Sequence, residues 1–273
     1  MPDISLKVKT QMKRNTLLVI CIFLIVGVRA QDDINKQQQI YPGGLFIEYG
    51  FGKYAVKDEY ISGQKYSGTL PYFSLNWSGY KNGRGYMLGI ESRNSAEIFN
   101  NDVACEASQT TFKQDFFNLI GKLRLFNNDV YTYLGPSADI LMYTLNYDFG
   151  TYNHVITESN GAIVSLGLNT QLIYYISDKF SAEGSLHISL ASICSKAFQS
   201  YKHDEPDTKL ILVPKATNSN IDIGFRFYII KSLSAKIIYR SQISRIDDWD
   251  PMISSSNNLI FSITYHFKKR DKQ

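Results

Sequence analysis

The sequence predicts an all-β fold, a ten-stranded antiparallel up-and-down transmembrane β-barrel that follows a cleaved signal peptide. Three observations lead to this fold class. Ten stretches of the 273-residue chain alternate apolar and polar residues with a period of two. The connections between these stretches alternate between short and long, and an apolar run near the start of the chain indicates export.

The first thirty residues have the layout of a secretory signal peptide. Four basic residues between positions 7 and 14 precede an apolar run over residues 17–26, and Val28-Arg29-Ala30 offers a cleavage site. A single transmembrane anchor is the alternative, but the run is shorter than the roughly 20 residues that a spanning helix needs. We therefore expect residues 1–30 to be a signal peptide and residues 31–42 to be a polar periplasmic lead-in.

The leader also carries the whole excess of positive charge. The full chain has 29 Lys and Arg against 25 Asp and Glu, a net charge of +4. Residues 1–30 hold five of the basic side chains and one of the acidic ones, so the remainder has 24 of each sign. A basic chain would suggest a nucleic acid partner. The balanced remainder removes that indication, and we expect no nucleic acid partner.

The clearest alternation lies in residues 220–243, which predict a β-hairpin. Odd-numbered residues from 221 to 229 are apolar, whereas the other parity carries Asp222 and Arg226. The second arm places Lys236 and Arg240 on its polar parity. Successive residues of a strand point to opposite faces, so each arm has one apolar face and one charged face. A soluble sandwich would bury the apolar face, whereas a membrane barrel turns it toward lipid.

The same alternation places ten strands along the chain. They lie at residues 45–52, 72–78, 86–93, 117–125, 131–147, 164–174, 183–190, 221–229, 235–243 and 259–267. Short turns follow the second, fourth, sixth and eighth strands, and the first of these contains Asn82-Gly83, a strong hairpin signal. The other connections are longer. They cover residues 55–65, 95–111, 148–161, 192–219 and 245–257.

This asymmetry separates the barrel from the sandwich. Outer-membrane barrels have short periplasmic turns and longer extracellular loops, and an even strand number puts both termini on the periplasmic side. We therefore expect an outer-membrane location with both termini in the periplasm. The barrel is expected to occupy residues 43–267, and residues 268–273 to form a basic periplasmic tail.

Two finer features are expected within the barrel. Pro136 lacks a backbone donor, which predicts a bulge in the fifth strand. Aromatic residues recur at the short-turn end, as in a girdle at a membrane interface. They are Tyr80, Tyr86, Phe126, Tyr131, Tyr175, Phe180, Tyr228 and Phe267.

The fourth strand reads Phe116-Phe117-Asn118-Leu119-Ile120-Gly121-Lys122-Leu123-Arg124, and a turn then leads to Tyr133-Leu134-Gly135-Pro136-Ser137-Ala138. These two strands resemble the PorT-like outer-membrane β-barrel proteins of Bacteroidetes. Ala30-Gln31 at the cleavage site and Phe267 near the end are also similar to that group, although Lys268 to Gln273 follow the closing aromatic residue here. The resemblance implies an outer-membrane barrel, with an envelope or secretion-machinery protein as a partner.

The parity that would face the lumen carries charges of both signs. We expect a lumen network of Glu48, Glu91, Lys122, Arg124, Asp139, Glu183, Asp222, Arg226, Lys236 and Arg240. An isolated charge in a poorly hydrated interior is costly, so these side chains are expected to pair across the lumen and fill it. A selective pore and a proton-linked site at His187 are the alternatives.

Cys105 and Cys194 are the cysteines that remain after the leader, and both fall at the end with the long connections. An even number of cysteines in an exported chain permits a disulfide between them. Two separate thiols are the alternative.

The sequence offers little support for an enzyme or a cofactor. The long connections contain acidic and His residues, a type that omptin-like ten-stranded proteases also place at the barrel rim. These are His154, His203, Asp204, Glu205, Asp247, Asp248 and Asp250, and the last three could alternatively touch calcium. No local motif fixes a nucleophile beside a base, and no P-loop, Cys/His metal pattern or dinucleotide fingerprint is present.

Three hypotheses follow from the sequence. The first is a non-enzymatic outer-membrane barrel without a cofactor, a structural or partner-binding envelope component in contact with outer-membrane lipid. The second is a small passive pore. The third is a hydrolase with its site at the rim.

Overall fold

The computed structural model describes residues 43–59, 62–81, 83–94, 97–100, 103–126, 128–149, 158–198, 207–212, 216–230, 232–247 and 251–267. The expected signal peptide, lead-in and basic tail lie outside these residues. The described residues contain no helix that is long and apolar enough to cross a membrane.

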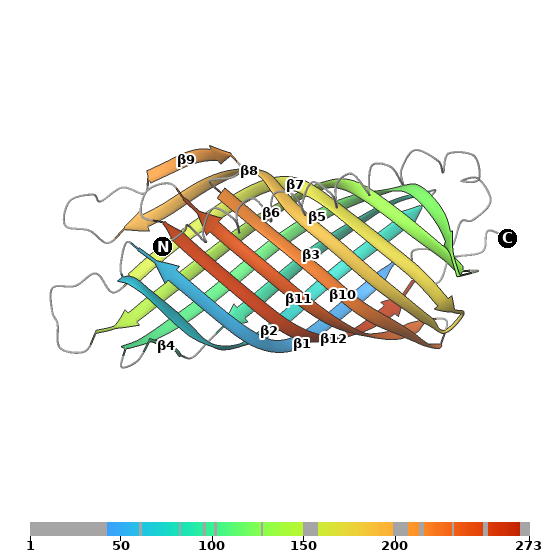
Figure 1. The fold of residues 1–273 in the computed structure, drawn as a ribbon, viewed down its shortest axis with the longest axis horizontal. Coiled ribbons are helices and arrows are strands. Elements are labelled where there is room, and N and C mark those ends of the chain that lie inside the picture. The colour runs from blue at the N-terminus through green and yellow to red at the C-terminus, as the bar shows by residue number, and fades with distance from the viewer. Residues whose placement is uncertain are drawn as a thin grey trace, which may run out of the picture.

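Ten long antiparallel strands close into a barrel, as predicted (Figure 1). They are β1 (Gly44–Asp58), β2 (Ser62–Lys81), β3 (Arg84–Asn94), β5 (Val103–Leu125), β6 (Asn128–Asp148), β7 (Glu158–Ser177), β8 (Phe180–Phe198), β10 (Ala216–Ile230), β11 (Leu233–Ile246) and β12 (Met252–His266). Each pairs with the next long strand, and β12 pairs with β1 along its whole length. The first and last described residues meet at one end, where the Phe267 amide donates to the Gly43 carbonyl at 3.2 Å.

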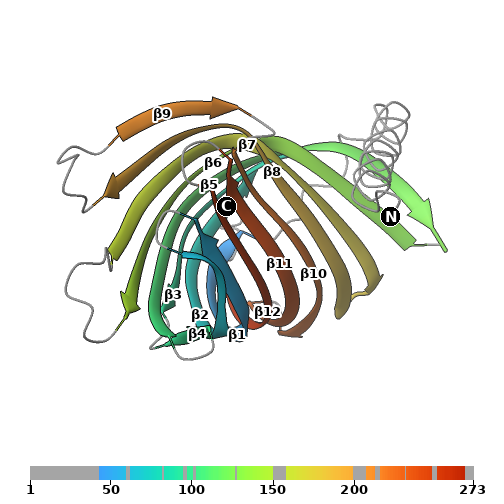
Figure 2. The same cartoon turned by 60° about the vertical axis from the view of Figure 1, so that its left-hand side comes forward.

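Two short strands lie at the opposite end. β4 (Ile98–Asn100) pairs with both β2 and β5, and β9 (Asp207–Leu212) pairs with the last part of β8. β8 therefore pairs with β10 up to Ile188 and with β9 from Ala191 onward, so β9 lies beside β8 at this end (Figure 2). Parts of two connections expected to be loops are thus strands.

The strands are longer than the alternation predicted. β5 contains 23 residues and β6 contains 21, because both continue beyond the apolar exterior. In these extensions the apolar side chains turn inward: Tyr54 and Val56 are buried, whereas Lys53 and Lys57 of the same strand face outward. The predicted parity fails there because the outer surface no longer meets lipid.

The connections keep the predicted asymmetry in a weaker form. The turns at residues 82–83, 126–127, 178–179 and 231–232 lie at the end that holds Gly43 and Phe267, here called the short-turn end. The other connections lie at what we call the long-loop end. Those at residues 59–61 and 247–251 are shorter than expected, whereas the one after β8 spans 199–215 and includes β9.

The exterior of the barrel is apolar and its interior is polar. Ile47 is 50% exposed, whereas its neighbour Glu48 is 6% exposed, and the same contrast recurs around the barrel. A soluble sandwich would show the reverse, so the structure confirms the barrel prediction. The apolar band, as we call this exterior, includes Tyr49, Phe51, Phe73, Leu75, Ile90, Phe112, Ile140, Leu166, Ile223, Phe225, Tyr239, Leu259, Phe261 and Ile263.

The bulge predicted at Pro136 is wrong. The pairs Asp115↔Ser137 and Asn118↔Leu134 have the same register, so the β5–β6 ladder is interrupted at Pro136 without gaining a residue. The register instead shifts between Leu119 and Gly121 of β5. A shift of one residue exchanges the two faces of a strand. Residues of β5 before the shift therefore have the opposite orientation from the one expected.

Candidate functional site

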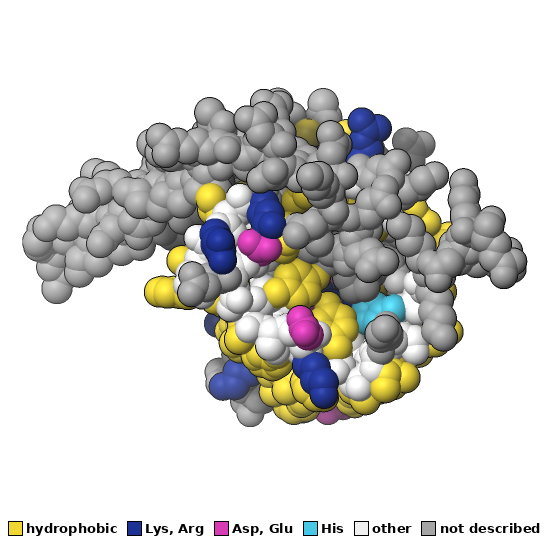
Figure 3. Space-filling model, turned by 90° about the vertical axis from the view of Figure 1, so that its right-hand side faces the viewer, with side chains coloured by type: hydrophobic (Ala, Val, Ile, Leu, Met, Phe, Trp, Pro, Cys, Tyr) yellow, Lys and Arg dark blue, Asp and Glu magenta, His cyan; other side chains and the backbone are white. Residues whose placement is uncertain are grey.

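The lumen has a polar layer between two apolar clusters. The cluster at the long-loop end consists of Tyr54, Val56, Tyr66, Leu70, Ile98, Cys105, Ala107, Leu141, Tyr143, Leu145, Tyr147, Ile163, Cys194, Ile246 and Met252. The cluster at the short-turn end consists of Phe117, Tyr131, Tyr133 and Ile173, with Tyr80, Met87, Leu119 and Tyr175 packed against it. Figure 3 views the short-turn end, where apolar side chains lie between charged ones.

Four aromatic residues expected in an exterior girdle face inward instead. Tyr80, Tyr131 and Tyr175 belong to the short-turn cluster, and the Tyr228 ring lies 5.7 Å from that of His266. Tyr228 and His266 both lie on the polar parity of their strands. This parity could have indicated that their rings face inward. These residues close the lumen rather than anchor the barrel at an interface.

Arg240 of β11 is the centre of the polar layer. Its guanidinium donates to Asp222 through Nε at 2.8 Å and through Nη2 at 2.7 Å. Nη1 donates to Glu91 Oε1 and to the Tyr72 hydroxyl, both at 2.7 Å. The planar guanidinium suits such bidentate contacts, and these four residues come from four strands. They join opposite walls of the barrel.

A second ionic cluster surrounds Glu183 of β8. Arg226 donates to its two carboxylate oxygens at 2.5 and 3.1 Å, and Lys236 Nζ lies 2.8 Å from Oε2. Arg226 Nη1 also donates to Ser234 and Thr264. One carboxylate therefore pairs with two cations, and the hydroxyls of Ser234 and Thr264 accept further hydrogen bonds from Arg226.

Arg93 and Glu48 extend the network along β3 and β1. Arg93 donates to Gln109 at 3.2 Å and to Gln242 at 2.5 Å, and its guanidinium lies 5.4 Å from the centre of the Tyr72 ring. Glu48 accepts hydrogen bonds from the Tyr72 hydroxyl at 3.2 Å and from Ser74 at 2.8 Å. Tyr72 thus connects Glu48 to Arg240, which contacts Glu91 directly.

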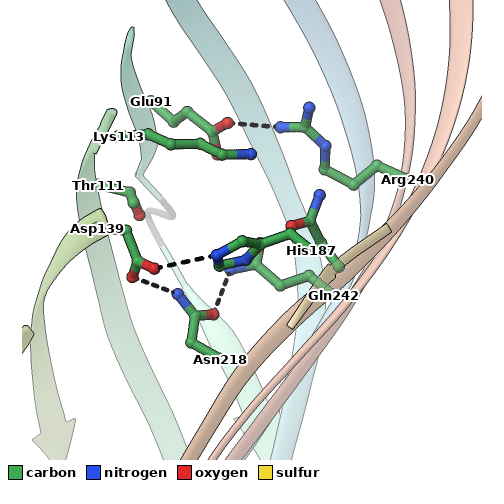
Figure 4. Close-up of a pocket in the computed structure, with 9 residues that line it drawn as sticks. Glu91, Thr111, Lys113, Asp139, His187, Asn218, Arg240 and Gln242 are labelled. Atoms are coloured by element: carbon green, nitrogen blue, oxygen red, sulfur yellow. Dashed lines mark hydrogen bonds and ion pairs between the residues drawn. The ribbon is translucent and has the colours of Figure 1, made fainter. Parts of the chain in front are cut away.

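A small cavity remains beside this network (Figure 4). His187 Nε2 lies 3.5 Å from Asp139 Oδ1, and Asn218 donates to the other Asp139 oxygen at 2.7 Å. Gln242 in turn donates to Asn218 Oδ1 at 3.1 Å. The cavity volume is about 10 Å³, room for about one water molecule and far too little for an organic ligand. The cavity suits ordered water, which bridges buried polar groups of this kind.

Eight of the ten residues expected in the lumen network lie there. Lys122 and Arg124 do not. The Lys122 ammonium pairs with Asp129 at 2.9 Å near the turn after β5, with both side chains about one-third exposed, and Arg124 is exposed. Both residues follow the register shift and keep the expected parity, since Lys122 pairs with the inward Tyr131, but they lie near the turn, beyond the short-turn cluster and away from the polar layer.

Three charges outside the expected set also line the lumen. Lys113 and Asp115 occupy the inward parity of β5, with Lys113 Nζ 3.5 Å from an Asp115 oxygen. Arg93 lies on the polar parity of β3, which could have indicated its inward orientation, but it is not among the ten residues expected in the lumen network. Gln109, Thr111, Lys113 and Asp115 alternate along this inward face, but all four precede the strand predicted at residues 117–125, so the prediction did not include them.

The two cysteines are free thiols within the long-loop cluster. The structure places Cys105 and Cys194 without a bond between them. Cys105 lies beyond the apolar band, next to the exposed Glu106. Burial raises the pKa of the Cys105 thiol to about 12. A thiol with such a pKa is a poor nucleophile.

The rim residues considered for catalysis or calcium lie mainly outside the described part of the chain. These are His154, His203, Asp204, Glu205, Asp248 and Asp250. Asp247 is described, and it forms an ion pair with Arg245 at 2.5 Å. Across the described ranges, no three His, Cys, Asp or Glu residues gather in a way that could hold a metal ion.

Comparisons with known proteins bear on the fold alone. No family model matches the sequence, and no curated protein matches it. Similar solved structures include the outer membrane protease OmpT from Escherichia coli, with 9% identity, a TM-score of 0.49 and coverage of 85% of this chain and 99% of that one. Neisserial surface protein A has 8% identity, a TM-score of 0.37 and coverage of 84% and 100%. Ail of Yersinia pestis has 11% identity, a TM-score of 0.31 and coverage of 83% and 100%.

Proposed function

We propose that this protein is a non-enzymatic outer-membrane β-barrel that does not conduct, and that it serves as a structural or partner-binding component of the envelope. The observation that carries the proposal is the filled lumen, in which paired charges lie between two apolar clusters. In the proposed orientation the short-turn end and both termini face the periplasm, in keeping with the short periplasmic turns of such barrels.

The exterior supports residence in a membrane. A closed barrel leaves its long strands without free edges in the region that would meet lipid, where an unpaired backbone group would be costly. The apolar band surrounds that region, and charged outward side chains such as Lys53 and Lys57 begin beyond it. The resemblance of the fourth and fifth strands to PorT-like proteins favours a partner in secretion or envelope assembly.

The packing of the lumen argues against a passive pore. Arg240 and Tyr72 connect opposite walls through hydrogen bonds of 2.7 Å, and Tyr133 and Leu141, in the two apolar clusters, are fully buried. A conducting path would have to cross all three layers. Small barrels are commonly filled by their own side chains in this manner.

The lumen also lacks the arrangement expected of a hydrolase. Catalysis of that kind needs a nucleophile within hydrogen-bond reach of a base, near donors for an oxyanion. His187 contacts Asp139 at 3.5 Å and forms a hydrogen bond with Asn220, and the described residues that line the cavity include no Ser or Cys. The cavity is closed to a peptide or lipid substrate by the apolar clusters.

The test combines folding and conductance measurements on residues 31–273 refolded in detergent. We expect slower migration after boiling on a denaturing gel, as for a closed barrel, and no steady current in a planar bilayer. A variant with Tyr72→Ala, Arg93→Ala and Arg240→Ala provides a control with a widened polar layer. Steady conductance of the wild-type sample would replace this proposal with the passive pore, and solubility without detergent would overturn the barrel in a membrane.

A further inference from the structure

Four cations gather on the outer face of adjacent strands near the long-loop end. The register places Arg245 of β11 opposite Ile253 of β12, Ile253 opposite Lys57 of β1, and Lys57 opposite Lys65 of β2. Lys53 of β1 lies two outward positions closer to the short-turn end, with Ala55 between it and Lys57. We call Lys53, Lys57, Lys65 and Arg245 the basic patch.

The patch contains a like-charge pair. Lys57 and Lys65 are directly opposite each other in the β1–β2 ladder. Like charges in this position destabilise a sheet unless an anion lies between them. Lys57 contacts Glu59 at 2.6 Å and Arg245 pairs with Asp247 at 2.5 Å, whereas Lys65 and Lys53 form no ion pair with a described residue. The patch therefore has more positive charge than its own acids neutralise.

The patch borders the apolar band. Along β1 the outward residues run Tyr49, Phe51, Lys53, and the last two are about 7 Å apart at the usual rise of a strand. On β11 the outward position after Ile243 is Arg245. The hydrocarbon core of a bilayer gives way to the lipid headgroups over a distance similar to this spacing of about 7 Å. Lys and Arg side chains that start just beyond the core therefore reach headgroup phosphates.

The opposite side of the barrel has the reverse charge at the corresponding end. Glu106 of β5 lies opposite Asn146 of β6, which lies opposite Glu158 of β7, and Asp148 is exposed nearby. We call Glu106, Asp148 and Glu158 the acidic face. If these charges served only solubility, an even mixture of both signs around this end of the barrel would serve equally well. The four cations of the basic patch outnumber the two acids paired with them, Glu59 and Asp247, so this side has a net positive charge where lipid headgroups would lie.

We propose that the basic patch binds the phosphate groups of anionic membrane lipids in the leaflet at the long-loop end. This inference rests on the proposed residence in a membrane, but it does not depend on a closed lumen. The patch spans three strand spacings from Arg245 to Lys65, about 15 Å. That width accommodates one large headgroup or two adjacent phospholipids. An anion there would also relieve the repulsion between Lys57 and Lys65.

The experiment measures lipid retention by native mass spectrometry of the refolded barrel in neutral detergent. The two probes are phosphatidylglycerol and phosphatidylcholine with identical acyl chains, so the net charge of the headgroup is the main difference. We expect phosphatidylglycerol adducts at a concentration at least tenfold lower than phosphatidylcholine adducts. The combined variant Lys53→Gln, Lys57→Gln, Lys65→Gln and Arg245→Gln should lose this preference.

The matched control removes charge from the acidic face with Glu106→Gln, Asp148→Asn and Glu158→Gln. This control should keep the lipid preference within about twofold of the wild type. Every variant is first checked for slower migration after boiling, so that a failure to fold is separated from a failure to bind. Equal retention of the two lipids, an unchanged preference in the patch variant, or full displacement by 10 mM inorganic phosphate would each overturn the assignment.

Discussion

Arg240 and Asp222 form a bidentate ion pair near the centre of the barrel, with N–O distances of 2.8 and 2.7 Å and both side chains almost fully buried. The pair joins neighbouring strands β11 and β10, and its second arm reaches Glu91 across the lumen. Buried pairs of this type contribute little net stability while intact, but they are costly to break because one charge is left without a partner.

The first prediction concerns this pair. Arg240→Met leaves Asp222 and Glu91 buried without their shared cation, so the free energy of unfolding should fall by about 3–5 kcal/mol. Urea titration of the refolded barrel measures the loss. The exposed pair of Lys122 and Asp129 provides the control, because Lys122→Met should cost no more than about 1 kcal/mol. Similar losses in the two variants would mean that the lumen is well hydrated and that its charges are not confined.

The second prediction uses the two cations around Glu183. Glu183→Gln leaves Arg226 and Lys236 side by side without a neutralising carboxylate, so this variant should be strongly destabilised. Adding Lys236→Met removes one of the two uncompensated charges. The double variant should therefore be more stable than Glu183→Gln alone, a non-additive result that a double-mutant cycle detects. Additive losses would show that the two side chains act independently.

The two faces of most strands could be distinguished from their period-two alternation. This alternation is present whichever environment surrounds the barrel. The errors have two physical sources. Beyond the apolar band the apolar side chains of Val56 and Ala107 turn inward, and a rule that apolar residues face outward assigns their segments to loops. Within β5, one extra residue between Leu119 and Gly121 exchanges the faces, and no residue type marks its position.

The sequence could predict that charged side chains fill the lumen, but not which of them contact each other. Charges of both signs on the inward parity required partners, yet the sequence could not say which strands would face each other across the barrel. Arg240 contacts Glu91 over a separation of 149 residues. Such a contact depends on strand tilt and on side-chain length, which alternation does not report. The apolar clusters at both ends likewise required the three-dimensional register.

The third prediction concerns the thiols. With a pKa of about 12, about one Cys105 side chain in ten thousand is ionised at pH 8. Cys105 and Cys194 should therefore resist N-ethylmaleimide in the folded barrel at pH 8, and both should react after denaturation in urea. Intact mass spectrometry counts the labels. A mass 2 Da lower than that of the dithiol, without labelling after denaturation, would instead reveal a disulfide.

The raised pKa also implies a dependence of stability on pH. The folded state binds the Cys105 proton more tightly than the unfolded state does, so its contribution is complete below about pH 9 and is lost as pH rises toward 12. The unfolding free energy of the wild type should thus fall more steeply in this window than that of Cys105→Ala. Parallel profiles would contradict the burial of this thiol.

The fourth prediction concerns Gly135, which precedes Pro136 where the β5–β6 ladder is interrupted. A Cβ atom at this position would lie 1.9 Å from the Phe116 carbonyl oxygen, a backbone atom that cannot move without displacing β5. Gly135→Ala should therefore destabilise the barrel by about 1–3 kcal/mol, as overpacking does. Gly63 near the β1–β2 turn has no heavy atom within 4 Å of the corresponding position, so Gly63→Ala should have little effect. Urea titrations of both variants provide the comparison, and equal stability of the two would show that the two strands separate easily at this interruption.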